Sequence, residues 1–302
     1  MLDTCFEKHI SLSIDIPQVA ISTQAFPSVW DVMEFCRVHE CPAVEYTFRR
    51  GAVSREEVAR EIPHIELLRR SGLFLRYHLA FPAFDLGHPD PARARAAVDF
   101  HLFCLRLVAD AGGDRATLHI GLDGALRGRV DYGAAARGLR ELVNAGERLG
   151  VRVCLENLRL GQTGNPGRFQ ELLDQSGAWA TLDVGHARAR GLASAAPGRA
   201  LDFISRCGER LLGAHVYEIE AVVEPGGPAR HLPPRDLDAI GPLLDAMLWG
   251  TSCDWWLIEL MDPVEMADTL SLLRLYQDGI KARAAASAPS PGAQHANRKE
   301  PA

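Results

Sequence analysis

Six short apolar stretches of this 302-residue sequence carry, at or near their ends, a side chain that can bind a metal ion. In chain order these side chains are His78, His119, Glu156, Asp183, His215 and Glu259. Carboxylates and imidazoles are common ligands of divalent metal ions in proteins. Several such charges buried together without a cation would cost several kcal/mol per ion. The set therefore predicts a divalent-metal site, provided that the fold brings the six ends together.

The elements that must position these residues follow an alternating pattern. Strand-like runs are predicted at 19–23, 42–48, 73–79, 116–122, 151–157, 179–185, 211–217 and 254–260. Amphipathic segments typical of helices occupy 28–40, 54–72, 91–112, 131–149, 167–177, 198–209, 236–249 and 263–280. This order predicts an α/β fold with parallel strands and right-handed crossovers, and eight such units close a (β/α)₈ TIM barrel. In that fold the carboxyl ends of the strands form the active face, where the polar residues would meet.

The ends of the chain differ from the middle. Residues 1–17 are predicted to be an N-terminal extension or an extra strand, and the pattern leaves open whether 10–14 form the first barrel strand. Residues 18–281 are expected to fold as one barrel domain, and the Ala/Pro/Ser-rich segment 282–302 is predicted to be disordered. No long apolar run or signal core is present, which predicts a cytoplasmic protein with no membrane contact.

Composition excludes several kinds of chemistry. The net charge of −6 gives no general attraction to nucleic acid or anionic membranes. Lysine occurs only at Lys8, Lys281 and Lys299, so Schiff-base chemistry and covalent pyridoxal phosphate are almost excluded. The sequence has no Walker or dinucleotide motif and no Gly-x-Ser-x-Gly motif, so nucleotide cofactors and serine hydrolysis are not supported. Seven scattered cysteines without a CxxC pair predict reduced thiols.

Four motifs give the chain a recognisable resemblance. They are LEN at 155–157, LDVGHA at 182–187, AHVYE at 214–218 and LIE at 257–259. Over residues 18–280 the sequence resembles the xylose isomerase-like TIM barrels. That superfamily includes sugar isomerases and epimerases, inosose dehydratases and endonuclease IV.

The resemblance implies a site and a reaction. In epimerase-like members, ligands matching Glu156, Asp183, His215 and Glu259 hold one divalent ion, often manganese. This ligand set suits Mn, Co, Mg or Zn. The residues matching Glu156 and Glu259 also act as the acid–base pair, and the one matching His186 contacts substrate. The implied activity is a metal-dependent isomerase or epimerase of a sugar or similar polyhydroxylated carbonyl compound, which moves a proton α to the carbonyl.

A zinc phosphodiester hydrolase resembling endonuclease IV is the alternative. Its three-zinc site would add residues matching His78, His119, His186 and His231, which are therefore candidates for further metal or substrate contacts. The position of a further aspartate ligand is occupied by Ala229. The acidic chain shows no cluster of arginines with stacking aromatics, so binding of nucleic acid is not expected.

A catalytically inactive sugar-binding relative is a third hypothesis. The retained pair Glu156 and Glu259 argues against it, because a binding protein would not need both carboxylates. The expected partner is a small-molecule substrate, and a homodimer is suggested only by the habit of the superfamily. Arg49–Arg50 and Arg188–Arg190 are interpreted as solvated loop charges. The pattern does not identify the substrate or the oligomeric state.

Three further features receive an expected role. Arg76 lies two residues before His78 and alternates to the same face, where it could bind an anionic substrate group or form an ion pair inside the barrel. Glu45 is expected either to orient groups of the site, and so contribute to substrate binding, or to form a structural salt bridge. The long Gly- and Pro-bearing loop 218–234 is expected to be a lid or specificity element.

Overall fold

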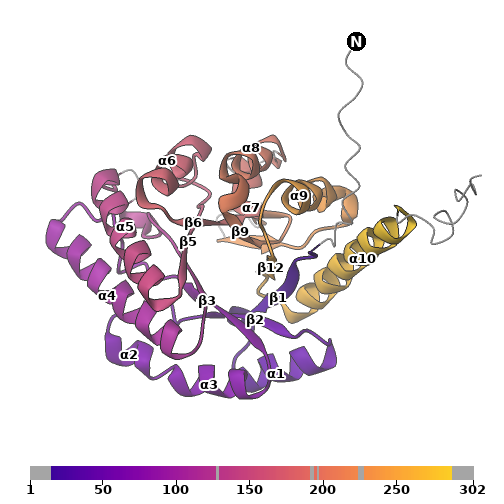
Figure 1. Cartoon of the computed structure of the whole chain (residues 1–302), viewed down its shortest axis with the longest axis horizontal. Coiled ribbons are helices and arrows are strands. Elements are labelled where there is room, and N and C mark those ends of the chain that lie inside the picture. The colour runs from indigo at the N-terminus through magenta and orange to yellow at the C-terminus, as the bar shows by residue number, and fades with distance from the viewer. Residues whose placement is uncertain (1–14, 127–128, 191–193, 196, 224–227, 288–302) are drawn as a thin grey trace, which may run out of the picture.

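The computed structural model describes residues 15–126, 129–190, 194–195, 197–223 and 228–287. Eight parallel strands form a closed barrel, and helices lie around its outside (Figure 1). The strands are β1 (Gln18–Ser22), β2 (Ala43–Thr47), β3 (Phe74–Leu79), β4 (Arg115–Leu118), β5 (Arg152–Glu156), β6 (Trp179–Asp183), β9 (Leu211–His215) and β12 (Trp255–Ile258). Their order around the barrel is β1-β12-β9-β6-β5-β4-β3-β2. The predicted TIM barrel is confirmed.

The first barrel strand is β1. It pairs with β12 on one side and with β2 on the other, which closes the barrel. The sequence pattern left residues 10–14 open as an alternative first strand. Those residues themselves lie outside the described part of the chain.

Ten helices occur in the described ranges. They are α1 (Val29–Val38), α2 (Arg55–Ala59), α3 (Ile62–Arg70), α4 (Pro91–Asp110), α5 (Tyr132–Leu149), α6 (Pro166–Ser176), α7 (Val184–Arg188), α8 (Pro197–Cys207), α9 (Leu237–Gly250) and α10 (Pro263–Ser287). Short 3₁₀ turns are η1 (Thr23–Ala25), η2 (Gly124–Leu126) and η3 (Gly208–Arg210). Two small antiparallel pairs join β7 (Ala189–Arg190) to β8 (Ser194–Ala195) and β10 (Ile219–Val222) to β11 (Ala229–Leu232). None of these helices combines the length and hydrophobicity that crossing a membrane requires.

Two helical predictions need correction. The segment 54–72 begins with the expected cap, since Ser54 accepts a hydrogen bond from the N–H of Glu57, but it forms two helices rather than one. Pro63 has no N–H to donate to the carbonyl of Ala59, so the chain breaks between α2 and α3. At the other end, α10 continues to Ser287, so residues 282–287 are helical and not part of a disordered tail. Residues 288–302 lie outside the described ranges.

The amino-terminal end of the barrel is closed by charged side chains. Asp254 precedes β12 and lies 2.7 Å from Nη1 of Arg115 and 3.0 Å from Nη1 of Arg76. The guanidinium of Arg76 also lies 4.2 Å from the ring centre of Trp255, which belongs to the small apolar cluster inside the barrel. This floor leaves the carboxyl ends of the strands as the open face.

Candidate metal centre

Four side chains from neighbouring strands converge at the carboxyl end of the barrel. Glu156, Asp183 and His215 are the last residues of β5, β6 and β9, and Glu259 directly follows β12. One ligand atom from each lies within 4.8 Å of the others, and all four residues are buried. The parallel register explains the meeting, because Asp183 and Leu257 both pair with His215. The fold thus gathers three carboxylates and one imidazole in the combination expected from the sequence.

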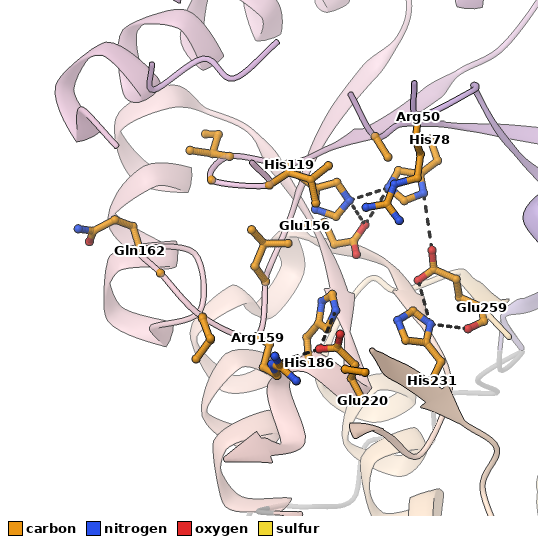
Figure 2. A pocket seen from close by; sticks show the side chains of 18 of the residues that line it. Arg50, His78, His119, Glu156, Arg159, Gln162, His186, Glu220, His231 and Glu259 are labelled. Atoms are coloured by element: carbon orange, nitrogen blue, oxygen red, sulfur yellow. Dashed lines mark hydrogen bonds and ion pairs between the residues drawn. The ribbon is translucent and has the colours of Figure 1, made fainter. Parts of the chain in front are cut away.

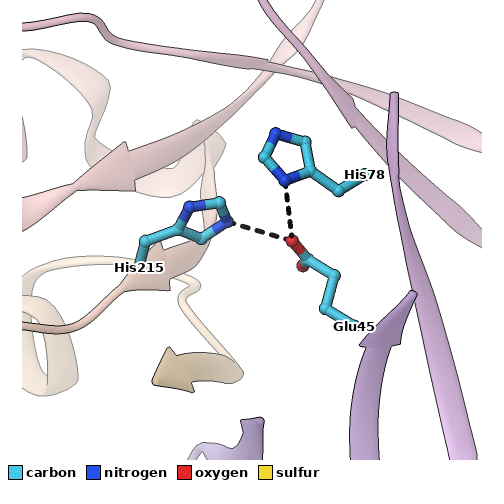
Figure 3. A group of neighbouring side chains, drawn as sticks. All are labelled: Glu45, His78 and His215. Carbon is cyan, nitrogen blue, oxygen red and sulfur yellow. Dashed lines mark ion pairs between the residues drawn. The ribbon is translucent and has the colours of Figure 1, made fainter. Parts of the chain in front are cut away.

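The His215 ring is held from both sides. Its Nδ1 lies 3.1 Å from Oε2 of Glu259 and 3.3 Å from Oε1 of Glu156. Its Nε2 lies 3.1 Å from Oε1 of Glu45 on β2, and the same oxygen lies 3.8 Å from Nδ1 of His78 (Figure 3). A carboxylate behind a ligating imidazole fixes the orientation of the ring. This geometry fits the orienting role expected of Glu45.

The electrostatics of the cluster favour a cation. Burial and the neighbouring Glu156 together raise the pKa of Asp183 well above its usual range. Burial opposes ionisation of Glu156 too, but the imidazoles of His119 and His215 outweigh it and lower the pKa of Glu156. Burial likewise disfavours the charged His215, yet the carboxylates of Glu156, Glu259 and Glu45 raise its pKa well above the usual range. Protons thus balance the charge where a divalent ion could do so.

Two buried oxygens are left for a ligand. Oε2 of Glu156 and Oδ2 of Asp183 accept no hydrogen bond from the residues that the structure describes. Imidazole nitrogens of His78 and His186 approach these two oxygens to 3.3 and 3.2 Å. Buried carboxylate oxygens of this kind are ligands for hard or borderline divalent ions. The residues present therefore fit a divalent metal ion.

A second group of donors adjoins Glu156. Nε2 of His78 lies 2.8 Å from Nε2 of His119, and the two nitrogens lie 3.3 and 3.4 Å from Oε2 of Glu156 (Figure 2). Burial lowers the pKa of His119 to about 3. Burial also opposes the charged form of His78, but the adjacent carboxylate of Glu156 outweighs it and raises the pKa of His78. One ring that donates its N–H to the unprotonated nitrogen of the other accounts for the short contact between the two nitrogens.

The LDVGHA motif turns the chain so that His186 reaches the site. Asp183 caps α7, because its Oδ1 accepts a 2.7 Å hydrogen bond from the N–H of His186. The side chain of Asn157 bonds to both the N–H and the carbonyl of Asp183, at 2.8 and 3.0 Å. A Cβ on Gly185 would lie 1.9 Å from the ring of Tyr217, so only glycine fits there. The motif thus fixes the positions of Asp183 and His186 together.

The expected lid folds as the hairpin β10–β11. His231 lies opposite Glu220 in the hairpin, and Nδ1 of His231 is 2.7 Å from the carbonyl oxygen of Glu259. The ring of Tyr217 stacks on His231 with 3.9 Å between centroids. Asp183, His186 and His231 form a further group of donor atoms within 4.8 Å. Residues 224–227 of the loop lie outside the described ranges.

The centre lies at the base of a cavity of about 750 Å³, within the size range of ligand sites. His78, His119, Glu156, His186 and Glu259 are among its lining residues. Sequence reasoning gave no site role to several others, which are Gln24, Arg50, Arg159, Glu220 and Met261. They lie on loops or on the hairpin, where no periodic pattern indicates which way a side chain points.

Gln24 is one of these missed residues. It donates hydrogen bonds of 3.2 Å to Oε1 of Glu259 and 3.3 Å to Oγ1 of Thr47. These contacts tie the η1 turn to the centre and leave the other oxygen of Glu259 facing His215. Because η1 directly follows β1, a polar residue just after that strand was the signal that could have found it.

Arg76 does not belong to the site. Its side chain takes part in the floor with Asp254 and Trp255, and it lines a separate hollow at that end of the barrel. Two residues before His78 on a strand is about 6.6 Å lower along the barrel, although the side chains share a face. The expected contact of Arg76 with substrate is therefore corrected, and the ion pair inside the barrel is what the structure shows.

Comparisons with known proteins agree with this fold. Residues 35–250 match the family described as "Xylose isomerase-like TIM barrel". An uncharacterized protein of Methanocaldococcus jannaschii is 33% identical over 165 residues, which cover 55% of this chain and 67% of that protein. The structure of an L-ribulose 3-epimerase is similar with a TM-score of 0.68 and 14% identity, covering 93% of this chain and 100% of that one. A protein of Thermus thermophilus soaked with ZnCl₂ gives 0.63 and 20%, covering 87% and 98%. At these identities the structural likenesses show the fold alone.

Proposed function

Because the chain belongs to the xylose isomerase-like TIM barrel family, we propose that it is a divalent-metal-dependent isomerase or epimerase of a sugar or similar polyhydroxylated carbonyl compound. The observation that carries this proposal is the buried convergence of Glu156, Asp183, His215 and Glu259 at the base of the cavity. The names of structurally similar proteins, such as L-ribulose 3-epimerase and D-psicose 3-epimerase, support the same reaction class.

Glu156, Asp183, His215 and Glu259 would hold the ion. A bound divalent cation supplies Lewis acidity toward the carbonyl and the neighbouring hydroxyl of a substrate. Mn, Co, Mg and Zn all accept this ligand set. Glu45 behind His215, and Asn157 behind Asp183, keep these two side chains in one orientation.

Glu156 and Glu259 are placed to move the proton. They come from β5 and β12, which are separated in the barrel by β6 and β9, so they approach a substrate from different sides. One carboxylate removes the proton α to the carbonyl, and the other returns a proton to the neighbouring carbon or to the opposite face. His78 and His119 contact Oε2 of Glu156 and can take part in its proton balance.

The test measures metal content and proton exchange on one protein sample. Tag-cleaved protein, prepared without chelators, is expected to hold about one Mn or Co ion per chain by plasma mass spectrometry. It is also expected to exchange the α-proton of a ketose or inosose-like compound with D₂O. Asp183→Ala should lower the metal content several-fold. The matched control is Asp131→Ala, because Asp131 also caps a helix, α5, but lies outside the cluster.

Three results would argue against the proposal. Unchanged metal content in Asp183→Ala would mean that the ion binds elsewhere. Absence of exchange in fully metal-loaded protein with every carbonyl compound tried would contradict the isomerase chemistry. Binding of sugars without exchange would favour a sugar-binding relative instead.

A zinc phosphodiester hydrolase is the second candidate function. The observation that favours it is the buried group His78, His119 and Glu156, which shares Glu156 with the main centre and could hold a second ion. A ratio of two or more, mostly zinc, together with cleavage of a phosphodiester, would support it. Ala229 supplies no ligand to the third group around His186 and His231, so a ratio of three is not expected.

A further inference from the structure

We infer that the substrate carries an anionic group, a carboxylate or a phosphate, and that Arg50 binds this group at the rim of the cavity. The inference rests on the proposed function for the chemistry at the base of the cavity. Its evidence is separate, because it comes from the charges and the backbone of the rim.

Four arginines of the described part of the chain line the cavity, and three of them are already paired. The pairs are Arg159 with Glu220 at 3.3 Å, Arg168 with Glu171 at 2.8 Å and Arg230 with Glu265 at 3.3 Å. Arg50 is the fourth, and its side chain has no ion-pair or hydrogen-bond partner among the residues that the structure describes. Among the residues that the structure describes, Arg50 is therefore the cavity arginine whose charge no carboxylate balances.

The backbone that carries Arg50 is fixed. The N–H of Phe48 donates a 3.1 Å hydrogen bond to the carbonyl of His78, and the N–H of Ala52 donates a 2.9 Å bond to the carbonyl of Arg49. The N–H of Arg49 also donates to the carboxylate of Glu61 at 3.1 Å. Phe48 and Ala52, on either side of the turn, are buried. Holding the turn in place lowers the entropy cost of binding a ligand there.

Figure 2 shows where this cation points. Arg50 enters the cavity from the side of His78, whereas Arg159 and Glu220 lie on the opposite side. A guanidinium offers two parallel N–H groups, which match the oxygens of a carboxylate or a phosphate. The positive charge of Arg159 is already balanced by Glu220, so the anion is assigned to Arg50.

The charge at the base of the cavity predicts which way round the substrate binds. Three carboxylates around one divalent ion would leave an excess negative charge there, since Glu156, Asp183 and Glu259 all belong to the cluster. An anionic group of the substrate would be repelled from that end and attracted to Arg50 at the rim. The substrate would thus enter with its carbonyl toward the metal centre and its charged end outward.

Binding of polyols that cannot be isomerised tests the subsite without relying on turnover. The probes are sorbitol, sorbitol 6-phosphate and gluconate, titrated calorimetrically into metal-loaded protein. We expect at least one anionic polyol to bind about 10- to 100-fold more tightly than sorbitol, the range of a charge-assisted contact. Arg50→Gln should remove this preference while leaving sorbitol affinity unchanged. Arg49→Gln is the matched control, because it removes the neighbouring exposed arginine, and it should retain the preference.

The outcomes separate the subsite from the chemistry. Equal binding of the three polyols, or an equal loss in both arginine variants, would overturn the assignment to Arg50. A preference for sorbitol 6-phosphate indicates a phosphate group in the substrate, and a preference for gluconate indicates a carboxylate. Arg50-dependent binding in a protein that exchanges no α-proton would uphold the subsite and contradict the proposed function.

Discussion

Both carboxylate oxygens of Glu156 contact ionisable groups of the centre, whereas one oxygen would be enough to bind a metal ion. One of its oxygens faces Nδ1 of His215, and the other faces Nε2 of both His78 and His119. A carboxylate in such surroundings can bind a cation with one oxygen and exchange a proton through the other. The chemistry should therefore depend on this residue more than on any single histidine.

Replacing Glu156 by Gln tests this dependence. The amide has the shape of the carboxylate but cannot accept the α-proton, so the rate of α-proton exchange should fall by about 100-fold or more. The thermal midpoint of Glu156→Gln should differ from that of the parent chain by no more than that of Glu218→Gln does. Glu218→Gln is the control, because it alters a buried glutamate outside the four-residue cluster. Full activity in Glu156→Gln would contradict the acid–base assignment.

At this scale the sequence predicted residues on strands better than residues on loops. Asp183 and His215 could be placed because parallel strands bring their carboxyl ends to the same end of the barrel. Arg76 was misplaced because alternation gives the face of a strand but not the depth along it. Arg50 and Glu220 were not recognised as cavity residues, since the path of a loop depends on tertiary contacts that no local pattern encodes.

Among the elements, α4 carries a histidine that links burial to pH. His101 is buried between this helix and the loop after β3, where its Nε2 lies 3.1 Å from the carbonyl oxygen of Phe84. Burial lowers the pKa of His101 to about 4. The unfolded chain takes up this proton near pH 6.5, whereas the folded chain does so only near pH 4.

Stability should therefore fall as the pH is lowered through this window. The contribution of His101 is fully present above pH 6.5, and about 3 kcal/mol of it is lost by pH 4. Urea unfolding at pH 7 and pH 4.5 should show a smaller loss in His101→Gln than in the parent chain. The exposed His64 provides the control, because His64→Gln should lose as much as the parent. An identical loss in all three proteins would contradict the assignment.

The elements themselves were largely predictable because their signals are local. Caps such as Ser54 and Asp131 fix where helices begin, and apolar runs bounded by turn residues give the strands. The pairing of β10 with β11 was missed because the segment 218–234 has no alternating apolar pattern. Its contacts with the centre, such as that of His231 with Glu259, stabilise the hairpin instead.

In the whole molecule, one end of the barrel is stabilised by ion pairs and the other end carries the candidate site. The floor joins Asp254 to Arg76 and Arg115, while the metal centre and the cavity occupy the other end. Removing the carboxylate would leave two largely buried guanidinium groups without their shared partner. The side chain of Asp254 is 51% exposed, so solvent would compensate part of the loss.

Asp254→Asn is expected to lower the free energy of unfolding by about 1–2 kcal/mol while leaving metal content and proton exchange unchanged. Chemical denaturation and plasma mass spectrometry would measure the two effects. Asp278→Asn removes only the exposed ion pair with Lys281 and should change stability by less than about 0.5 kcal/mol. A parallel loss of stability and metal in Asp254→Asn would mean that the two ends are linked.

The ionic floor also has a consequence for how such a protein can change over generations. Substitutions in the rim turn around Arg50 or in the β10–β11 hairpin do not touch Asp254 or its arginines. Exposed positions of the rim turn, such as Arg50, can therefore vary and change the contacts with a substrate while the ion pairs of the floor stay intact. New substrate preferences become accessible through mutations that selection for stability would leave in place.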